Sequence, residues 1–279
     1  MKKVYAVPAV SALLGIAALL LRRVQNLKEF DAATGLPIPG GFCATALPVL
    51  LAVSAVVLAA LVWKMPRESG DGPAFTEAFS AAASTDVLLP VTGSLLLGLS
   101  GAADIATAFG LLGKTVSAMS ASGLSAILIG TGDHFSKGTH LILGVLTLAA
   151  AFSVFSAAAA CRRGTETPLN NSLLLVPPLA MVIRLVFAFR AYSISPALST
   201  YYMEMLALVL LTLAFYRLSS FGFRAGRSRI FCLYAALAVV FALGAAADAA
   251  SLASLLLYPG CALTLAGFLL LRLRSHHSA

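Results

Sequence analysis

The sequence is poor in charge. Asp, Glu, Lys and Arg make up 11% of its 279 residues, whereas an ordinary soluble domain carries roughly 25%. Hydrophobic residues make up 60% of the chain, and the mean hydropathy is +0.95. So little charge cannot cover the surface of a soluble domain, and the composition therefore predicts an integral membrane protein.

The sequence also lacks the motifs of metal sites and of common enzymes. Its four histidines have no H-E-x-x-H spacing, and the chain has neither a G-x-S-x-G turn nor a P-loop. We therefore expect no cofactor, no bound metal and no enzymatic activity. The cysteines are scattered, which favours neither a disulfide framework nor a metal site; they are Cys43, Cys161, Cys232 and Cys261.

What the sequence has instead is a series of apolar runs, each close to the roughly 20 residues that cross a bilayer as a helix. We expect an all-α, polytopic membrane bundle that forms one transmembrane domain over residues 1–279. A ninth, shorter run at 115–130 is rich in Ser, Gly and Ala, and it could span, re-enter or lie at the interface. The eight clear runs are 4–21, 44–63, 87–109, 141–160, 172–189, 198–216, 230–250 and 252–271.

The ends of these runs indicate an orientation. Arg22 and Arg23 follow the first run directly with no small-residue cleavage site, so we expect a retained first helix and not a signal peptide. The positive-inside rule puts the basic loop 217–229 and the C-terminus on the cytoplasmic side. The excess of Lys and Arg on the cytoplasmic side is the same for eight and for nine spans, so the rule does not decide the number of spans. We expect a multi-pass protein of a prokaryotic-type inner (cell) membrane, whose net charge of +8 reflects loops beside anionic lipid and no nucleic acid.

Three weak similarities, in the same order, relate the two parts of the chain. The segment VPAVSALLGIAALLLRR resembles VPPLAMVIRLVFAFRAY, LAALVWKM resembles LTLAFYRL, and LGLSGAADIAT resembles FALGAAADAAS. They predict a duplicated four-helix unit with halves at 1–138 and 171–279, the alternative being chance similarity of Ala- and Leu-rich helices. Repeats of this kind build transporters.

Five side chains in or near the apolar runs are candidate binding residues, because an ionisable group at membrane depth usually faces a partner or a wet cavity. Arg184 and Glu204 are expected at equal depth on neighbouring helices, where they would pair. Asp248 is expected near the same, outward-facing end, and Tyr201 lies on the helical face of Glu204. If the protein has eight spans, Asp104 lies at the same end as the other candidates. If it has nine, Asp104 lies at the opposite end.

These residues support two hypotheses of function. In the first, the protein is a secondary transporter or solute-binding permease whose outward half binds a small anionic or zwitterionic solute, or a proton. In the second, it is a non-transporting membrane scaffold or sensor subunit, and the charges form structural ion pairs. The second hypothesis predicts charges that are satisfied internally, without a cavity that reaches Arg184. Beyond the lipid bilayer, the sequence does not identify a protein partner.

One loop between the expected spans has an amphipathic pattern. In the segment 67–86, Gly and Pro residues precede Phe75 and Phe79, which are four residues apart and share a helical face. The pattern predicts a short helix that lies on the membrane surface.

Overall fold

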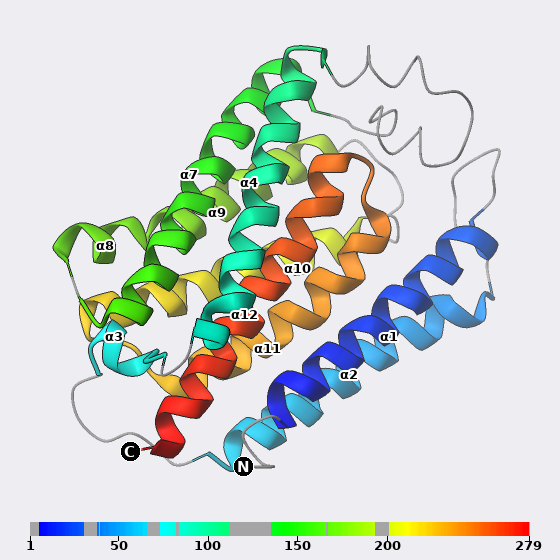
Figure 1. The fold of residues 1–279 in the computed structure, drawn as a ribbon. Helices are drawn as coiled ribbons and strands as arrows, with labels where there is room; N and C mark the ends of the chain where they lie inside the picture. Colours follow the sequence, from blue (N-terminus) through cyan, green and yellow to red (C-terminus); the bar gives the residue numbers. More distant parts are fainter. Residues whose placement is uncertain are drawn as a thin grey trace.

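The computed structural model describes residues 6–30, 38, 40–65, 73–81, 84–111, 135–165, 167–192 and 201–278. Within these ranges the chain forms helices and no strand (Figure 1). The helices are α1 (Ala6–Lys28), α2 (Phe42–Trp63), α3 (Phe75–Ala78), η1 (Ser84–Val87), α4 (Leu88–Ala108), α7 (Lys137–Arg163), α8 (Pro168–Leu173), α9 (Val176–Tyr192), α10 (Tyr202–Ser219), η3 (Ser220–Phe223), α11 (Ser228–Ala245), η4 (Ala246–Asp248) and α12 (Leu252–Ser278).

Eight of the described helical segments are long and apolar enough to cross a membrane, which confirms the all-α polytopic bundle. Each contains or closely overlaps one of the eight predicted runs. The predicted ninth run lies outside the described residues. The helices before and after it, α4 and α7, are antiparallel, with Asp104 near the end of α4 in contact with His140 near the start of α7. The helix α4 therefore ends, and α7 begins, at the same end of the bundle, as eight spans require.

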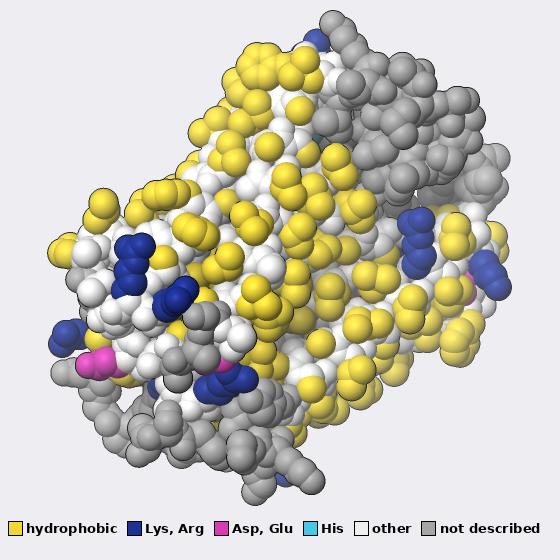
Figure 2. Space-filling view, in the orientation of Figure 1, with side chains coloured by type: hydrophobic (Ala, Val, Ile, Leu, Met, Phe, Trp, Pro, Cys, Tyr) yellow, Lys and Arg dark blue, Asp and Glu magenta, His cyan; other side chains and the backbone are white. Residues whose placement is uncertain are grey.

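The bundle has two chemically different ends. One, which we call the acidic end, holds Asp104, Glu204 and Asp248, where α4 and α11 finish and α10 begins. At the other, the basic end, α1 begins and α12 finishes (Figure 1). The basic end also holds the arginine-rich segments, and Figure 2 shows Lys and Arg side chains on the surface there. The arginines of these segments are Arg162, Arg163, Arg217, Arg224, Arg227, Arg229, Arg272 and Arg274.

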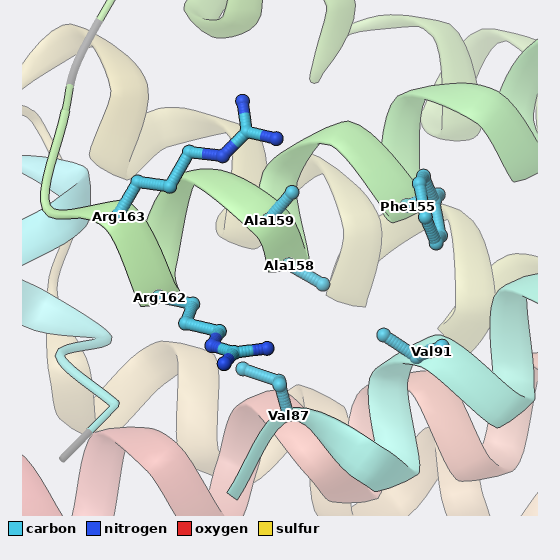
Figure 3. Close-up of a pocket in the computed structure, with 7 residues that line it drawn as sticks. All are labelled: Val87, Val91, Phe155, Ala158, Ala159, Arg162 and Arg163. Carbon is cyan, nitrogen blue, oxygen red and sulfur yellow. The ribbon is translucent and has the colours of Figure 1, made fainter. Parts of the chain in front are cut away.

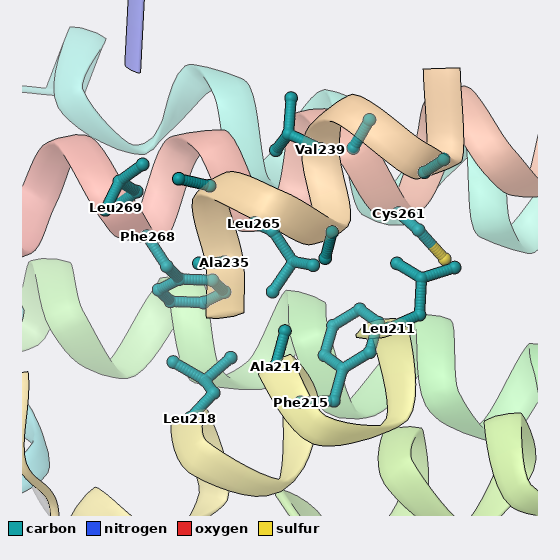
Figure 4. Packing of buried hydrophobic residues seen from close by; sticks show 14 of the residues in the cluster. Leu211, Ala214, Phe215, Leu218, Ala235, Val239, Cys261, Leu265, Phe268 and Leu269 are labelled. Atoms are coloured by element: carbon teal, nitrogen blue, oxygen red, sulfur yellow. The ribbon is translucent and has the colours of Figure 1, made fainter. Parts of the chain in front are cut away.

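The core lies where α10, α11 and α12 pack together (Figure 4). In α11, 72% of the membrane span is buried inside the protein, compared with 28% in α2. The buried face of α11 is rich in alanine, and small side chains let helices approach closely in lipid, where no hydrophobic force drives helix pairing. Leu211, Phe215 and Phe268 fill the space between these helices. The α1–α2 hairpin is by contrast peripheral.

Glycines set the close crossing of α4 and α7 near the acidic end. A Cβ atom placed on Gly101 would lie 2.8 Å from the carbonyl oxygen of Gly144, and one on Gly144 would lie 2.8 Å from the carbonyl oxygen of Gly101. Further along the same pair of helices, a Cβ on Gly98 would meet only Ala151, at 3.9 Å. The two helices therefore touch backbone to backbone at the acidic end, and Figure 1 shows that they diverge toward the basic end.

The short helix α3 differs from the expectation for its loop. Phe75 and Phe79 are buried, and the ring of Phe79 packs edge-on against Phe221, Phe231 and Phe268, with ring centroids 5.0–5.6 Å apart. The predicted short helix forms, but the prediction that its Phe face lies against the membrane surface was wrong, because that face is buried in the protein. The two rings pack instead in an aromatic cluster at the basic end, where ring pairs of this geometry are favourable.

Replacing Gly144 with Ala should destabilise the bundle, because the new methyl group has no room at the α4–α7 crossing. Overpacking of this kind typically costs about 1–3 kcal/mol, which a thermal-unfolding measurement in detergent would record as a lower melting temperature. Gly138→Ala is the matched control on the same helix, since a Cβ there meets nothing within 4 Å. Equal melting temperatures for the two variants would contradict the assigned crossing.

Candidate functional site

Three buried ionisable side chains of the acidic end form a cluster on three helices. Nη1 of Arg184, on α9, lies 3.2 Å from Oδ2 of Asp104, on α4. Nδ1 of His140, on α7, lies 3.1 Å from the other carboxylate oxygen. Asp104 is completely buried, and the side chain of Arg184 is only 2% exposed. Both oxygens of Asp104 are thus engaged by basic groups from two other helices.

Glu204, on α10, is held by tyrosines instead of a cation. The hydroxyl of Tyr258, on α12, donates to Oε1 at 2.6 Å, and the hydroxyl of Tyr192, on α9, donates to Oε2 at 2.7 Å. The ring of Tyr192 stacks on that of Tyr201, with centroids 5.2 Å apart and planes 5° from parallel. Tyr201 therefore supports a tyrosine that binds Glu204, and it makes no hydrogen bond of its own to that carboxylate.

The predicted ion pair between Arg184 and Glu204 was wrong, although the helical hairpin that carries them was right. The two residues lie close enough to interact electrostatically, but Arg184 bonds to Asp104, 80 residues earlier in the chain. The physical reason lies in the competing donors. Two tyrosine hydroxyls already satisfy Glu204, whereas Asp104 is fully buried and needs a cation for compensation.

A second buried arginine pairs with Asp248. The Nε atom of Arg22, on α1, lies 2.8 Å and 3.0 Å from the two carboxylate oxygens, and Arg22 is 1% exposed. Asn26, one turn further along α1, donates to Asp248 Oδ1 at 2.7 Å, and Gln25 accepts from Arg22 at 2.8 Å. The pair joins the peripheral α1 to the end of the buried α11.

Together these groups form one network with an excess of acid. Among the described residues, the carboxylates of Asp104, Glu204 and Asp248 face two buried arginines, Arg184 and Arg22. Glu204 lies within electrostatic range of both Arg184 and Asp248. An unbalanced charge in a low-dielectric interior is costly, so the network has room for one more positive charge.

Sequence reasoning missed several members of the network. Arg22 lies just beyond the predicted run, which ends at residue 21, yet α1 continues for two more turns. Its spacing to Gln25 and Asn26, three and four residues on, places all three on one helical face and is the available signal. His140 lies one residue before the predicted run 141–160, and Tyr258 lies within the predicted run 252–271. For neither residue does the sequence contain a pattern that predicts its hydrogen-bond partner.

No family model, curated protein or solved structure matches the chain. Within the described part of the chain, no group of three or more His, Cys, Asp and Glu side chains could hold a metal ion. The fold shown is therefore a membrane-spanning helical bundle, and its function has to be inferred from the site.

Removing one partner of the buried pair should destabilise the protein far more than removing both. Asp104→Asn or Arg184→Gln leaves a buried charge alone, at a typical cost of about 3–5 kcal/mol. The double variant lacks that unpaired charge, and a double-mutant cycle of chemical unfolding in detergent should give a coupling energy of roughly 1–3 kcal/mol. Strictly additive losses would mean that the two side chains do not interact.

Proposed function

We propose that the protein is a proton-coupled secondary transporter or permease, with the acidic-end network as its coupling site. The observation that carries the proposal is the unequal count of charges in the described part of the chain, where the buried carboxylates of Asp104 and Glu204 and the partly exposed one of Asp248 face two buried arginines. One proton balances this count. Ionisable groups inside transmembrane segments are rare and are typical of proton relays and of solute pathways.

Two residues of the network are suited to hold that proton. His140 contacts Asp104 and would balance the charge when it is protonated. Glu204 has hydroxyl donors and no arginine partner, so it would become neutral when it takes the proton. Movement of the proton between these positions changes which carboxylate attracts Arg184, and that is the kind of differential interaction that can shift a two-state equilibrium.

An anionic or zwitterionic solute would be bound by Arg184. A guanidinium binds a carboxylate or a phosphate with two parallel hydrogen bonds, and in the present closed arrangement Asp104 occupies it. Opening of the acidic end would exchange the Asp104 carboxylate for that of the solute, with Tyr192 and Tyr201 nearer the helix ends. Asp248 and Arg22 would hold the α1 side of the site.

The second candidate, a non-transporting scaffold or sensor subunit, is favoured by a different observation. Arg184, Asp104 and Arg22 are at most 2% exposed, and their side chains have partners inside the protein. In this hypothesis the ion pairs fix the relative heights of the helices, and no solute enters.

Solute uptake by vesicles that contain the purified protein separates the two candidates. We expect an imposed proton gradient to drive uptake of at least one of four radiolabelled probes, L-glutamate, glycine, lactate or inorganic phosphate. Glu204→Gln should remove the proton dependence of that uptake, because the amide cannot take up a proton but still accepts a tyrosine hydroxyl. Glu77→Gln, on the exposed side of α3, is the matched control and should behave as the unaltered protein.

Two results would reject the transporter. One is proton-driven uptake that survives both Arg184→Gln and Asp248→Asn at the full rate, since neither charge would then take part. The other is the absence of uptake with all four probes while these variants change only the unfolding temperature. The second result is what the scaffold predicts.

A further inference from the structure

A groove between two membrane-spanning helices opens at the basic end. It is formed by η1 and α4 on one side and by α7 on the other (Figure 3), and its volume is about 500 Å³. Volumes of roughly 300–1,000 Å³ are typical of small-ligand sites. Five apolar side chains and two arginines line this α4–α7 groove, namely Val87, Val91, Phe155, Ala158, Ala159, Arg162 and Arg163.

The groove exists because of the packing described above. Gly101 and Gly144 bring α4 and α7 into backbone contact at the acidic end, and the helices separate toward the basic end. Between them, the short side chains of Ala158 and Ala159 leave space that Val91 and Phe155 border (Figure 3). Phe155 is 47% exposed on a span that faces the hydrocarbon. The apolar part of the groove therefore opens toward lipid.

Arg162 and Arg163 lie in the last turn of α7, at the polar end of the groove, and both are exposed. In the described part of the chain neither makes an ion pair or a hydrogen bond through its side chain. The nearby carboxylate of Asp86, next to Val87, is paired with Arg274. Two positive charges thus remain uncompensated beside an apolar slot.

We propose that the α4–α7 groove binds an anionic phospholipid. The lipid phosphate lies between Arg162 and Arg163, which can each give it parallel hydrogen bonds. An acyl chain follows the apolar wall past Phe155, which precedes Arg162 by seven residues, or about 10 Å along the helix. The abundance of Lys and Arg at this end predicts a cytoplasmic location, where anionic lipids attract basic residues and basic pockets between helices bind their headgroups.

The probe for this site is dioleoyl phosphatidylglycerol. The control lipid is dioleoyl phosphatidylcholine, which has the same acyl chains and no net charge. Native mass spectrometry of the full chain in neutral detergent counts bound lipid over a titration. We expect phosphatidylglycerol to be retained in preference to phosphatidylcholine. Arg162→Gln with Arg163→Gln should weaken its binding roughly thirtyfold, since each arginine beside an anionic lipid contributes about a factor of five.

A matched control removes the same charge elsewhere at this end. Arg224 and Arg227 are exposed, lie outside the groove, and can be replaced together by Gln. This control should keep wild-type binding, and an equal loss in both double variants would overturn the site in favour of a general attraction to surface charge. Wild-type binding by the Arg162 and Arg163 double variant would overturn it directly.

Two further measurements test the apolar part and the source of the phosphate. Val91→Trp fills the groove without changing charge, and it should reduce phosphatidylglycerol binding at least tenfold while the melting temperature in detergent stays near that of the wild type. Unchanged binding in a folded Val91→Trp protein would contradict occupation by an acyl chain. Competition by millimolar glycerol 3-phosphate, to the same extent as by the lipid, would overturn a lipid site in favour of a soluble phosphate.

Discussion

The ion pair between Arg184 and Asp104 is the constraint around which the acidic end is arranged. The hydrocarbon offers no water to a buried charge, so each one needs a partner from another helix. Asp104 takes its partners from α9 and α7, and one carboxylate thereby fixes the relative heights of three spans. Glu204 is left to the hydroxyls of Tyr192 and Tyr258, and these bonds attach α10 to α9 and α12.

The two arginine–aspartate pairs are related in an ordered way. In the predicted duplication with eight spans, α1 corresponds to α9 and α4 corresponds to α11. Arg22 on α1 pairs with Asp248 at the end of α11, and Arg184 on α9 pairs with Asp104 on α4. Each pair would therefore join the first helix of one half to the third helix of the other. The duplication itself stays a prediction, and the packing of the two halves is not alike, since α1 packs on α11 whereas α9 packs on α7 and α10.

Sequence reasoning reached the bundle because helix length and hydropathy are local properties. Each of the eight spans follows from an uninterrupted apolar run, and the depth of Asp248 follows from counting along its helix. The partners are not local. Arg184 pairs with Asp104 and not with Glu204, which is nearer in the sequence. His140 contacts the same carboxylate, although it lies just outside the predicted run 141–160. The aromatic burial of Phe79 is equally invisible in sequence, because it depends on rings from η3, α11 and α12 that meet only after folding.

Arg22 and Asp248 are separated by 226 residues, and this spacing has a consequence for biosynthesis. The first helix leaves the ribosome with an arginine near its end long before the seventh helix exists. Until then Arg22 can be hydrated only by reaching to the membrane surface, as long cationic side chains do. Docking of the α1–α2 hairpin against α11 therefore belongs to the last stage of assembly. The earliest part of the chain to be synthesised is among the last to take its final place.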